Sequence, residues 1–338
     1  MSSVSANASS VLILGANGRL GCAAAQAFAA AGWTVLAQVR NTPSPLLPPA
    51  ARILRMDLSN VSAVASAAAG ASTVVYAVNP AYPRWKTDAM PALRSGLAIA
   101  TRLRAHFMLP GNVYNFGESM PTVLREHTLA VPSTRKGQIR VDMEALMAQH
   151  AAATGLPTSV IRAGDFFGFG TGSWLDLVIA KSLRSGTLVY PGPMDLAHPW
   201  AYLPDLARAF VRLAASPAKP GFEVWNFQGY TLTGDALLEA IKAAAGALGI
   251  QPTRAWHRRE FPWRVLRVGG LVVPVWRELA EMAYLWRVPH GLDGRRLAAL
   301  EGVAEAQTPQ AAAFKNALQA MGLGTPRLAS DHKIRATL

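Results

Sequence analysis

The sequence has 338 residues, of which 51% are hydrophobic, so it can form one large or two closely joined domains with a substantial core, which argues against intrinsic disorder. A single cysteine, Cys22, excludes an internal disulfide framework and a Cys-rich metal cluster, and it favours a cytoplasmic location. The formal net charge is +13, but only 16% of the residues are charged and no unbroken basic run or zinc-finger spacing occurs. We therefore expect a basic surface and no nucleic-acid partner.

No segment of the sequence predicts a membrane-spanning helix or an export signal. Residues 1–10 contain no Lys or Arg, whereas a signal peptide begins with basic residues. The apolar residues 268–276 are too few to cross a bilayer, and arginines flank them. We therefore expect no membrane partner.

Strands and helices alternate through the first half of the chain. Short apolar runs predict strands at residues 11–14, 33–39, 52–56, 72–78, 112–114 and 158–162. Helical patterns lie between them, at residues 19–31, 61–69, 87–105 and 135–153. This order predicts an α/β fold of the Rossmann type over residues 1–164, with a doubly wound parallel sheet and right-handed crossovers.

After Gly164 the alternation becomes less regular. An aromatic and glycine-rich loop occupies residues 166–172. Further helices are predicted at residues 203–215, 233–245, 275–286 and 309–321. We expect a smaller, mostly helical substrate lobe over residues 165–338, with some segments returning to the sheet and a cleft beside it.

The clearest chemical signal lies between the first predicted strand and the first helix, where the sequence reads Gly-Ala-Asn-Gly-Arg-Leu-Gly. At this position one glycine allows a tight turn, a second lets the backbone approach a pyrophosphate, and a third lets helix and strand pack closely. The start of the helix adds unpaired N–H groups that bind an anion. We predict a dinucleotide site with contacts from Gly15, Asn17, Gly18, Arg19, Leu20 and Gly21.

The end of the second predicted strand indicates which dinucleotide binds. Sites that prefer NAD carry an acidic residue there for the ribose hydroxyls, whereas this strand ends Gln-Val-Arg-Asn. Arg40 can form a charged fork to a 2′-phosphate, and Arg19 can assist it. We therefore favour NADP(H) over NAD(H) as the cofactor.

These motifs resemble those of the extended and atypical short-chain dehydrogenase/reductases. The resemblance covers the glycine loop, Met-Asp-Leu after the third strand, Val-Asn-Pro after the fourth, and Trp-Ala-Tyr-Leu-Pro-Asp-Leu-Ala at residues 200–207. It implies that Asp57 and Leu58 border the adenine. It also implies that Val78, Asn79 and Pro80 border the ribose on the nicotinamide side.

The catalytic hallmark of that family, a Tyr followed four residues later by Lys, is absent from the expected helix. The one such pair, Tyr82 and Lys86, follows the fourth strand, where it is a coincidence or part of a pocket wall. The expected helix instead contains Lys-Gly-Gln-Ile-Arg-Val-Asp-Met-Glu from residue 136, a pattern similar to that of isoflavone reductase-like members. That resemblance makes Lys136 the proton-handling group and an anchor for the cofactor ribose. The alternative is a solvated basic helix start.

Other polar and aromatic side chains complete the expected site. Asn115 and Tyr114 follow the fifth predicted strand, where classical family members place a catalytic serine, so they are candidates for orienting substrate. His198 is a candidate acid or base, and no metal-ligand cluster appears. The candidate substrate wall consists of Tyr82, Asp165, Phe166, Phe167, Trp174, His198, Trp200 and Tyr202.

Together these features predict an NADP(H)-dependent oxidoreductase that transfers hydride to a carbonyl, enone or related small organic acceptor. Two alternatives stay open. One is a sugar epimerase or dehydratase, which oxidises a sugar carbon reversibly. The other is a catalytically inactive NADP(H)-binding sensor, which the missing Tyr-x-x-x-Lys favours. The sequence leaves a homodimer open and does not identify the substrate.

Overall fold

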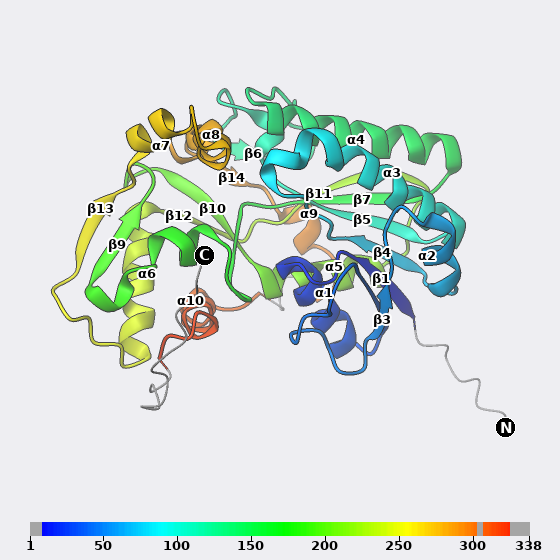
Figure 1. Cartoon of the computed structure of the whole chain (residues 1–338), viewed down its shortest axis with the longest axis horizontal. Helices are drawn as coiled ribbons and strands as arrows, with labels where there is room; N and C mark the ends of the chain where they lie inside the picture. Colours follow the sequence, from blue (N-terminus) through cyan, green and yellow to red (C-terminus); the bar gives the residue numbers. More distant parts are fainter. Residues whose placement is uncertain (1–8, 303–306, 325–338) are drawn as a thin grey trace.

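The computed structural model describes residues 9–302 and 307–324 and has a seven-stranded parallel sheet at its centre (Figure 1). The strand order is β11-β7-β5-β4-β1-β2-β3. The strands are β1 (Ser10–Leu14), β2 (Thr34–Val39), β3 (Arg52–Arg55), β4 (Thr73–Tyr76), β5 (His106–Gly111), β7 (Pro157–Arg162) and β11 (Gly221–Asn226). The Rossmann-type sheet predicted from the sequence is thereby confirmed.

The order of the strands places a site at one edge of the sheet. The chain builds outward from β1 to β3 in one direction and from β4 to β11 in the other, so the topology switches between β1 and β4. Ligands of open α/β sheets bind at this switch point, outside the carboxyl ends of the strands. Residues 11–14 of β1 are wholly buried between β2 and β4, which fixes the register of the sheet's centre.

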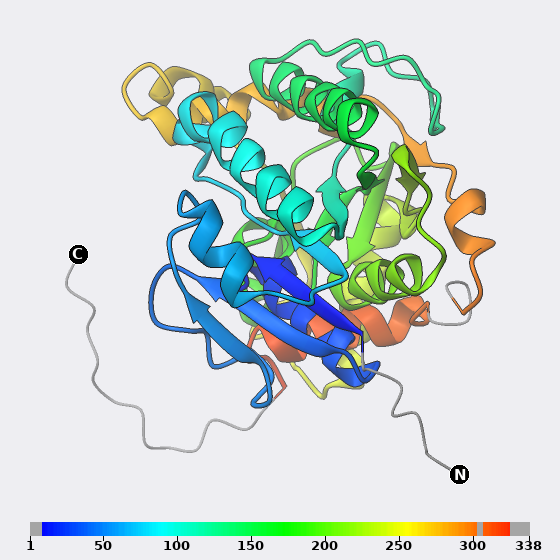
Figure 2. The same ribbon diagram turned by 90° about the vertical axis from the view of Figure 1, so that its right-hand side faces the viewer.

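Helices cover both faces of the sheet. Figure 2 shows α3 and α4 above the sheet and α1 below it. On one face α1 (Arg19–Ala30) packs against α5 (Leu203–Ala215). The other face carries α2 (Val61–Ala67), α3 (Trp85–Leu103) and α4 (Arg135–Thr154), in contact one after another. Each layer encloses a separate apolar cluster, so the sheet is buried on both sides as parallel sheets require.

The fifth strand differs from the prediction. The expectation of a strand at residues 112–114 is wrong, because β5 covers His106–Gly111 and residues Tyr114–Phe116 form a 3-10 turn. Pro110 and Gly111 look like turn residues in the sequence, yet both pair with β7. Pro110 is partly exposed, and its ring is tolerated in a short strand that β4 pairs only as far as Met108.

In the described residues, the C-terminal half combines helices with three small sheets, one of which includes β6 from the first half. Strands β8 (Asp165–Phe167), β10 (Ala197–Tyr202) and β12 (Tyr230–Thr233) form one sheet, β9 (Thr187–Tyr190) pairs with β13 (His257–Glu260), and β6 (Val123–Leu124) pairs with β14 (Gly291–Leu292). The helices are α6 (Gly234–Ala247), α7 (Trp263–Gly269), α8 (Pro274–Glu281), α9 (Arg295–Ala298) and α10 (Gln310–Ala320). The sequence predicted most of these helices, but not the strands. Within the described residues no helix is both long and apolar enough to cross a bilayer.

Candidate functional site

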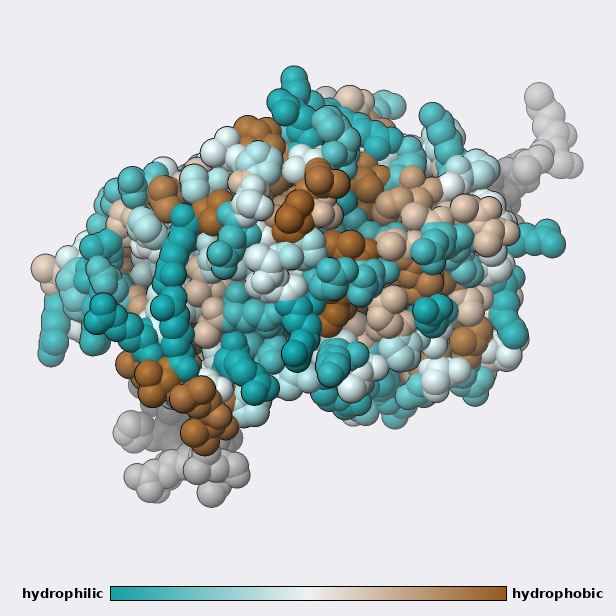
Figure 3. Space-filling model, turned by 90° about the horizontal axis from the view of Figure 1, so that it is seen from above, coloured by the Kyte–Doolittle hydropathy of each residue, from teal (hydrophilic) through white to brown (hydrophobic). Residues whose placement is uncertain are grey.

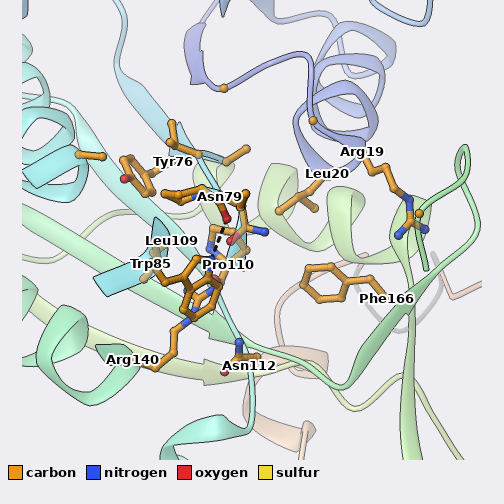
Figure 4. Close-up of a pocket in the computed structure, with 18 of the residues that line it drawn as sticks. Arg19, Leu20, Tyr76, Asn79, Trp85, Leu109, Pro110, Asn112, Arg140 and Phe166 are labelled. Atoms are coloured by element: carbon orange, nitrogen blue, oxygen red, sulfur yellow. Dashed lines mark hydrogen bonds between the residues drawn. The ribbon is translucent and has the colours of Figure 1, made fainter. Parts of the chain in front are cut away.

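A cleft of about 1170 Å³ lies at the carboxyl ends of the strands, between the main sheet and the C-terminal elements (Figure 4). Residues that directly follow β1, β2, β4, β5 and β7 line it, together with side chains of residues 165–178 and 261–290. The cleft is continuous from the glycine loop to the small sheets. One cavity therefore brings the predicted dinucleotide loop and much of the predicted substrate wall together.

The glycine loop has the geometry that a pyrophosphate site needs. Gly15 has φ +76°, and a Cβ there would lie 3.0 Å from the Val78 backbone. A Cβ on Gly21 would lie 2.5 Å from the Gly15 carbonyl oxygen, so only glycine lets α1 approach β1 this closely. No side chain caps the start of α1 at Gly18, and no acidic residue occupies its first turn. The positive end of α1 is thus free to hold an anion, and the loop fits a dinucleotide.

A buried glutamine holds this loop in place. The Gly15 backbone N–H donates to Gln38 Oε1 at 3.0 Å, and Gln38 Nε2 donates to the Met56 carbonyl oxygen at 2.6 Å. Asn17 connects the loop to the segment after β2, because its Nδ2 donates to the Thr42 carbonyl oxygen and its Oδ1 accepts from Ser44. These hydrogen bonds hold the loop against β2 and the segments that follow β2 and β3.

Arg40, Asp57 and Leu58 border the part of the cleft beside the ends of β2 and β3. Asp57 Oδ1 accepts hydrogen bonds from the Ser59 hydroxyl at 2.6 Å and the Ser59 N–H at 2.8 Å. These bonds lower the pKa of the Asp57 carboxyl, and the nearby charge of Arg40 lowers it further. Arg40 is exposed at the end of β2. This is the geometry expected for the adenosine end of the site.

The Arg19 side chain is oriented away from the adenosine end of the site. Its guanidinium donates to the carbonyl oxygens of Gly168, at 2.7 Å, and Phe169, at 3.2 Å. In Figure 4 it lies beyond Phe166, apart from the side chains around Asn79. Burial lowers the pKa of Arg19. The expected help from Arg19 at a 2′-phosphate would require both hydrogen bonds to break, so in this structure Arg19 joins the glycine loop to the C-terminal half instead.

At the centre of the cleft, the ends of β4 and β5 meet α3 and α4. Val78, Asn79 and Pro80 line the cleft, and their contact with the cofactor ribose stays a prediction. Trp85 Nε1 donates to the Pro80 carbonyl oxygen at 2.8 Å, and the Arg140 guanidinium lies 4.8 Å from the centroid of a Trp85 ring. Arg140 also donates to the Pro110 carbonyl oxygen at 3.2 Å. Figure 4 shows Asn79, Trp85, Pro110 and Arg140 grouped there.

The candidate catalytic residues are placed differently from one another. Tyr114 lines the cleft, whereas Lys136 and Asn115 do not and are each 1% exposed. Both polar atoms of the Asn115 side chain are buried without a hydrogen-bond partner among the described residues. Asn112, which the sequence reasoning missed, lines the cleft instead, and its Oδ1 accepts from the Tyr114 N–H at 3.1 Å.

Lys136 is held by two carboxylates of α8. Its Nζ donates to Glu278 Oε2, to Glu281 Oε2 at 2.6 Å and to the Glu278 carbonyl oxygen at 3.2 Å. Glu281 Oε1 also accepts from the Lys136 N–H at 3.3 Å. A solvated helix start is therefore wrong for Lys136, because it is buried and its charge is balanced. In this structure it connects α4 to α8, and its proton-handling role stays a prediction.

The predicted substrate wall divides into two groups. Asp165, Phe166, Trp174 and His198 line the cleft. Phe167, Trp200 and Tyr202 do not, because they are buried in the apolar cluster beneath it. The side chain of Tyr82 lies outside the described residues. Residues that the sequence reasoning missed complete the wall, namely Phe261, Leu279, Leu285 and His290.

His198 forms the most polar contact of this wall. Its Nε2 lies 2.9 Å from Asp165 Oδ2 and its Nδ1 lies 3.3 Å from the Leu285 carbonyl oxygen. Trp286 stacks on the His198 ring, with centroids 4.4 Å apart and planes 6° apart. Nδ1 faces a carbonyl oxygen and so donates to it, and the second hydrogen bond needs one proton between Nε2 and the Asp165 carboxyl. Asp165 and His198 can thus hold a proton beside the cleft.

His290 stands next to this pair, with ring centroids 5.3 Å apart. Burial, and then the neighbouring His198, lower the pKa of His290 to about 4, so its ring is neutral near pH 7. His290 Nδ1 lies 2.8 Å from the Val288 carbonyl oxygen and donates to it. Its Nε2 is then an acceptor, and it has no hydrogen-bond partner among the described residues. Asp165, His198 and His290 together offer a proton donor and a hydrogen-bond acceptor at one end of the cleft.

A family model for NAD-dependent epimerases and dehydratases matches residues 11–227, well over half of the chain. The chain belongs to the NAD-dependent epimerase/dehydratase family. The predicted extended short-chain dehydrogenase/reductase character and the NAD(P)-dependent enzyme class are thereby confirmed. The finer likeness to isoflavone reductases stays a prediction. No curated protein matches the chain in sequence.

Several solved structures share the fold over nearly the whole chain. MoeE5 in complex with UDP-glucuronic acid and NAD is 18% identical, with a TM-score of 0.68, and the match covers 93% of this chain and 99% of MoeE5. UDP-glucose 4-epimerase from Thermotoga maritima is 14% identical (TM-score 0.70; 93% and 98% covered). L-threonine dehydrogenase from Clostridium difficile is 18% identical (TM-score 0.68; 93% and 98% covered). At these identities the likeness establishes the fold.

Proposed function

We propose that this family member is an NADP(H)-dependent reductase that transfers hydride to a carbonyl, enone or related small organic acceptor. One observation carries the proposal: a single cleft joins the glycine loop, the ends of β4 and β5, and the Asp165–His198 pair. A hydride donor and a proton-holding pair in one cavity are what the reduction of a carbonyl requires.

The bound cofactor would supply the hydride. The residues of the chain would bind the cofactor, orient the substrate, hold a proton and exclude water. The glycine loop and α1 hold the pyrophosphate, while Asn79 and Pro80 border the nicotinamide half. Asp165 and His198 hold a proton for the substrate oxygen as charge develops there, and the Tyr114 hydroxyl and Asn112 amide orient that oxygen. The aromatic side chains Phe166, Trp174 and Phe261 exclude water and suit a partly apolar substrate.

The preference for NADP(H) rests on Arg40. It is exposed at the end of β2 and lines the cleft, where a dinucleotide carries its 2′-substituent, and no acidic side chain follows β2 directly. Among solved relatives of the fold, MoeE5 binds NAD. The preference is therefore a property to be tested on this chain.

The test is cofactor oxidation by the purified protein with a panel of aldehydes, enones and quinones, with NADPH and NADH compared in parallel. We expect NADPH to be consumed faster with at least one acceptor class. Tight NADPH binding without turnover on any acceptor would contradict the proposal and support the cofactor-binding sensor.

Family membership favours one second candidate, an epimerase or dehydratase acting on a nucleotide sugar. Such an enzyme oxidises and re-reduces the same sugar carbon, so the cofactor is not consumed. Incubation with UDP-sugars followed by product chromatography separates the two candidates, because an epimerase would convert substrate without added reductant. We also propose a cytoplasmic location, which the sequence favours, and a homodimer, which the sequence leaves open.

A further inference from the structure

Helices α7 and α8 form a hairpin whose outer surface is apolar, and neither the fold nor the cleft accounts for it. Leu271 and Val272 at the tip are 85% and 84% exposed, and Val268 is 70% exposed. Val265, Val275 and Trp276 extend this surface, with 37–57% exposure. Exposed aliphatic residues scattered singly are ordinary, but a contiguous group of this kind marks a contact surface.

The hairpin is built as a defined structure. A Cβ on Gly269 would lie 2.3 Å from Trp276, so the glycine allows α7 and α8 to touch there. Within the turn, the Val272 N–H donates to the Gly269 carbonyl oxygen at 3.0 Å and the Val273 N–H donates to the same oxygen at 2.8 Å. At its base Trp263 Nε1 donates to the Pro191 carbonyl oxygen at 2.6 Å. The apolar tip is therefore presented outward by a fixed turn.

The exposed charges nearest to this tip in the sequence are positive. Residues 261–277 contain Arg264, Arg267 and Arg277, all exposed, and no acidic residue. The preceding strand β13 adds exposed Arg258 and Arg259 next to an exposed Glu260, and Glu278 lies 3.9 Å from Arg277, so the excess charge around the hairpin is positive. Figure 3 shows the face that is uppermost in Figure 1, where hydrophobic side chains gather on a projection at the lower left beside strongly hydrophilic ones.

We propose that the α7–α8 hairpin docks on the surface of a bilayer that contains anionic lipids. Aliphatic residues and a tryptophan enter the interface while the arginines contact lipid phosphates, as in helices that lie in the membrane plane. A second copy of the chain fits this surface poorly, because a symmetric contact would bring the same arginines together. This inference departs from the expectation of no membrane partner, which concerned spanning segments, and it does not depend on the proposed reaction.

The direct test is sedimentation of the full-length protein with vesicles of phosphatidylcholine alone or mixed with phosphatidylglycerol. We expect binding to the mixed vesicles only, weakened by added salt because screening reduces the arginine contacts. The double variant Leu271→Asp, Val272→Asp should bind at least about tenfold more weakly. The double variant Arg264→Glu, Arg267→Glu should lower the affinity for mixed vesicles about fivefold or more for each arginine replaced. Leu46→Asp, at an exposed leucine outside the hairpin and the cleft, is the matched control and should bind like the wild type.

A second readout keeps the test independent of how well the charged variants fold. Cys22 is buried, so a Val272→Cys variant takes an environment-sensitive fluorophore at the tip, and a Leu46→Cys variant takes it at the control site. Only the tip label should shift its emission on mixed vesicles. Wild-type protein that stays in the supernatant with these vesicles would overturn the proposal, as would equal binding by the Leu271→Asp, Val272→Asp variant. A wild-type dimer that this variant converts to a monomer, without vesicle binding, would assign the surface to self-association instead.

Discussion

At the scale of single residues, Arg40 is the side chain on which cofactor choice depends. Replacing it with alanine removes a charged donor at the end of β2, so we expect NADPH affinity to fall about tenfold to a hundredfold while NADH affinity changes little. Fluorescence titration with each cofactor measures both. The matched control is Arg52→Ala, an exposed arginine on the adjacent strand β3 that does not line the cleft. Equal losses for NADPH and NADH would refute the 2′-phosphate contact.

The Asp165–His198 pair is the residue-scale test of the chemistry. His198→Gln keeps a polar side chain but cannot hold the imidazole proton, so we expect kcat to fall about a hundredfold or more with cofactor binding retained. Asp165→Asn should have a similar effect and should change the pH profile of kcat. His150→Gln on α4 is the control, since His150 bonds to Thr101 outside the cleft. Unchanged turnover in both cleft variants would remove the pair from the mechanism.

The asparagines after β5 show what the sequence could and could not predict about the site. The sequence predicts a strand at residues 112–114, which makes Asn115 the polar side chain that follows it. Because β5 ends at Gly111, Asn112 follows it directly, and Asn112 reaches the cleft while Asn115 is buried. A shift in the strand boundary thus moved the site assignment by three residues. The glycine loop was not affected by this error, because the spacing of its glycines locates it without any prediction of where a strand ends.

At the scale of elements, the ion pairs of Lys136 connect α4 to α8, whose Leu279 lines the cleft. Lys136→Met leaves two carboxylates near a buried site without their cation, so we expect the free energy of unfolding to fall by about 3 kcal/mol. Lys242→Met removes an exposed pair with Glu239 and should cost less than about 1 kcal/mol. Chemical denaturation of the wild type and the two variants measures these free energies of unfolding. Equal losses in the two variants would contradict a structural role for the Lys136 pairs.

The Lys136→Met variant also separates the structural role of Lys136 from the proton-handling role that the sequence predicts. Glu278→Gln with Glu281→Gln weakens the α4–α8 connection but leaves the lysine in place. Both variants are compared with saturating cofactor, at a temperature where each is folded. A much larger loss of turnover for Lys136→Met would support proton handling, and similar losses would assign Lys136 to positioning of α8.

Elements of the C-terminal half were harder to predict than those of the first half. The helix predicted at residues 203–215 coincides with α5, because its apolar face repeats every three to four residues. Strands such as β13, His257–Glu260, have four exposed residues and no apolar alternation, so no sequence pattern identifies them. The pairing of Lys136 with α8 was equally hidden, since it joins residues more than 140 positions apart.

At the scale of the whole molecule, two buried histidines make stability depend on pH. Burial lowers the pKa of His106 to about 4, and burial with His198 nearby lowers that of His290 to about 4, whereas an unfolded chain has histidine pKa values near 6.5. Both rings are therefore neutral in the folded protein over a range in which the unfolded chain binds protons. Their contribution to stability is fully present above pH 6.5 and is lost as the pH falls from 6.5 to about 4.

Each histidine then lowers the free energy of unfolding by up to about 3 kcal/mol across this range. We expect the melting temperature to fall steadily from pH 7 to pH 4, as measured by circular dichroism. His106→Asn keeps a hydrogen-bonding side chain opposite the Ser159 hydroxyl, which lies 2.8 Å from His106 Nε2, but removes the titrating ring. This variant should show a shallower slope than the wild type, even if it is less stable at pH 7. His127→Asn is the comparison, because His127 is exposed on a loop and this change should leave the slope unchanged. A wild-type melting temperature that is constant over this interval would show that the two rings are charged or solvated in the folded protein.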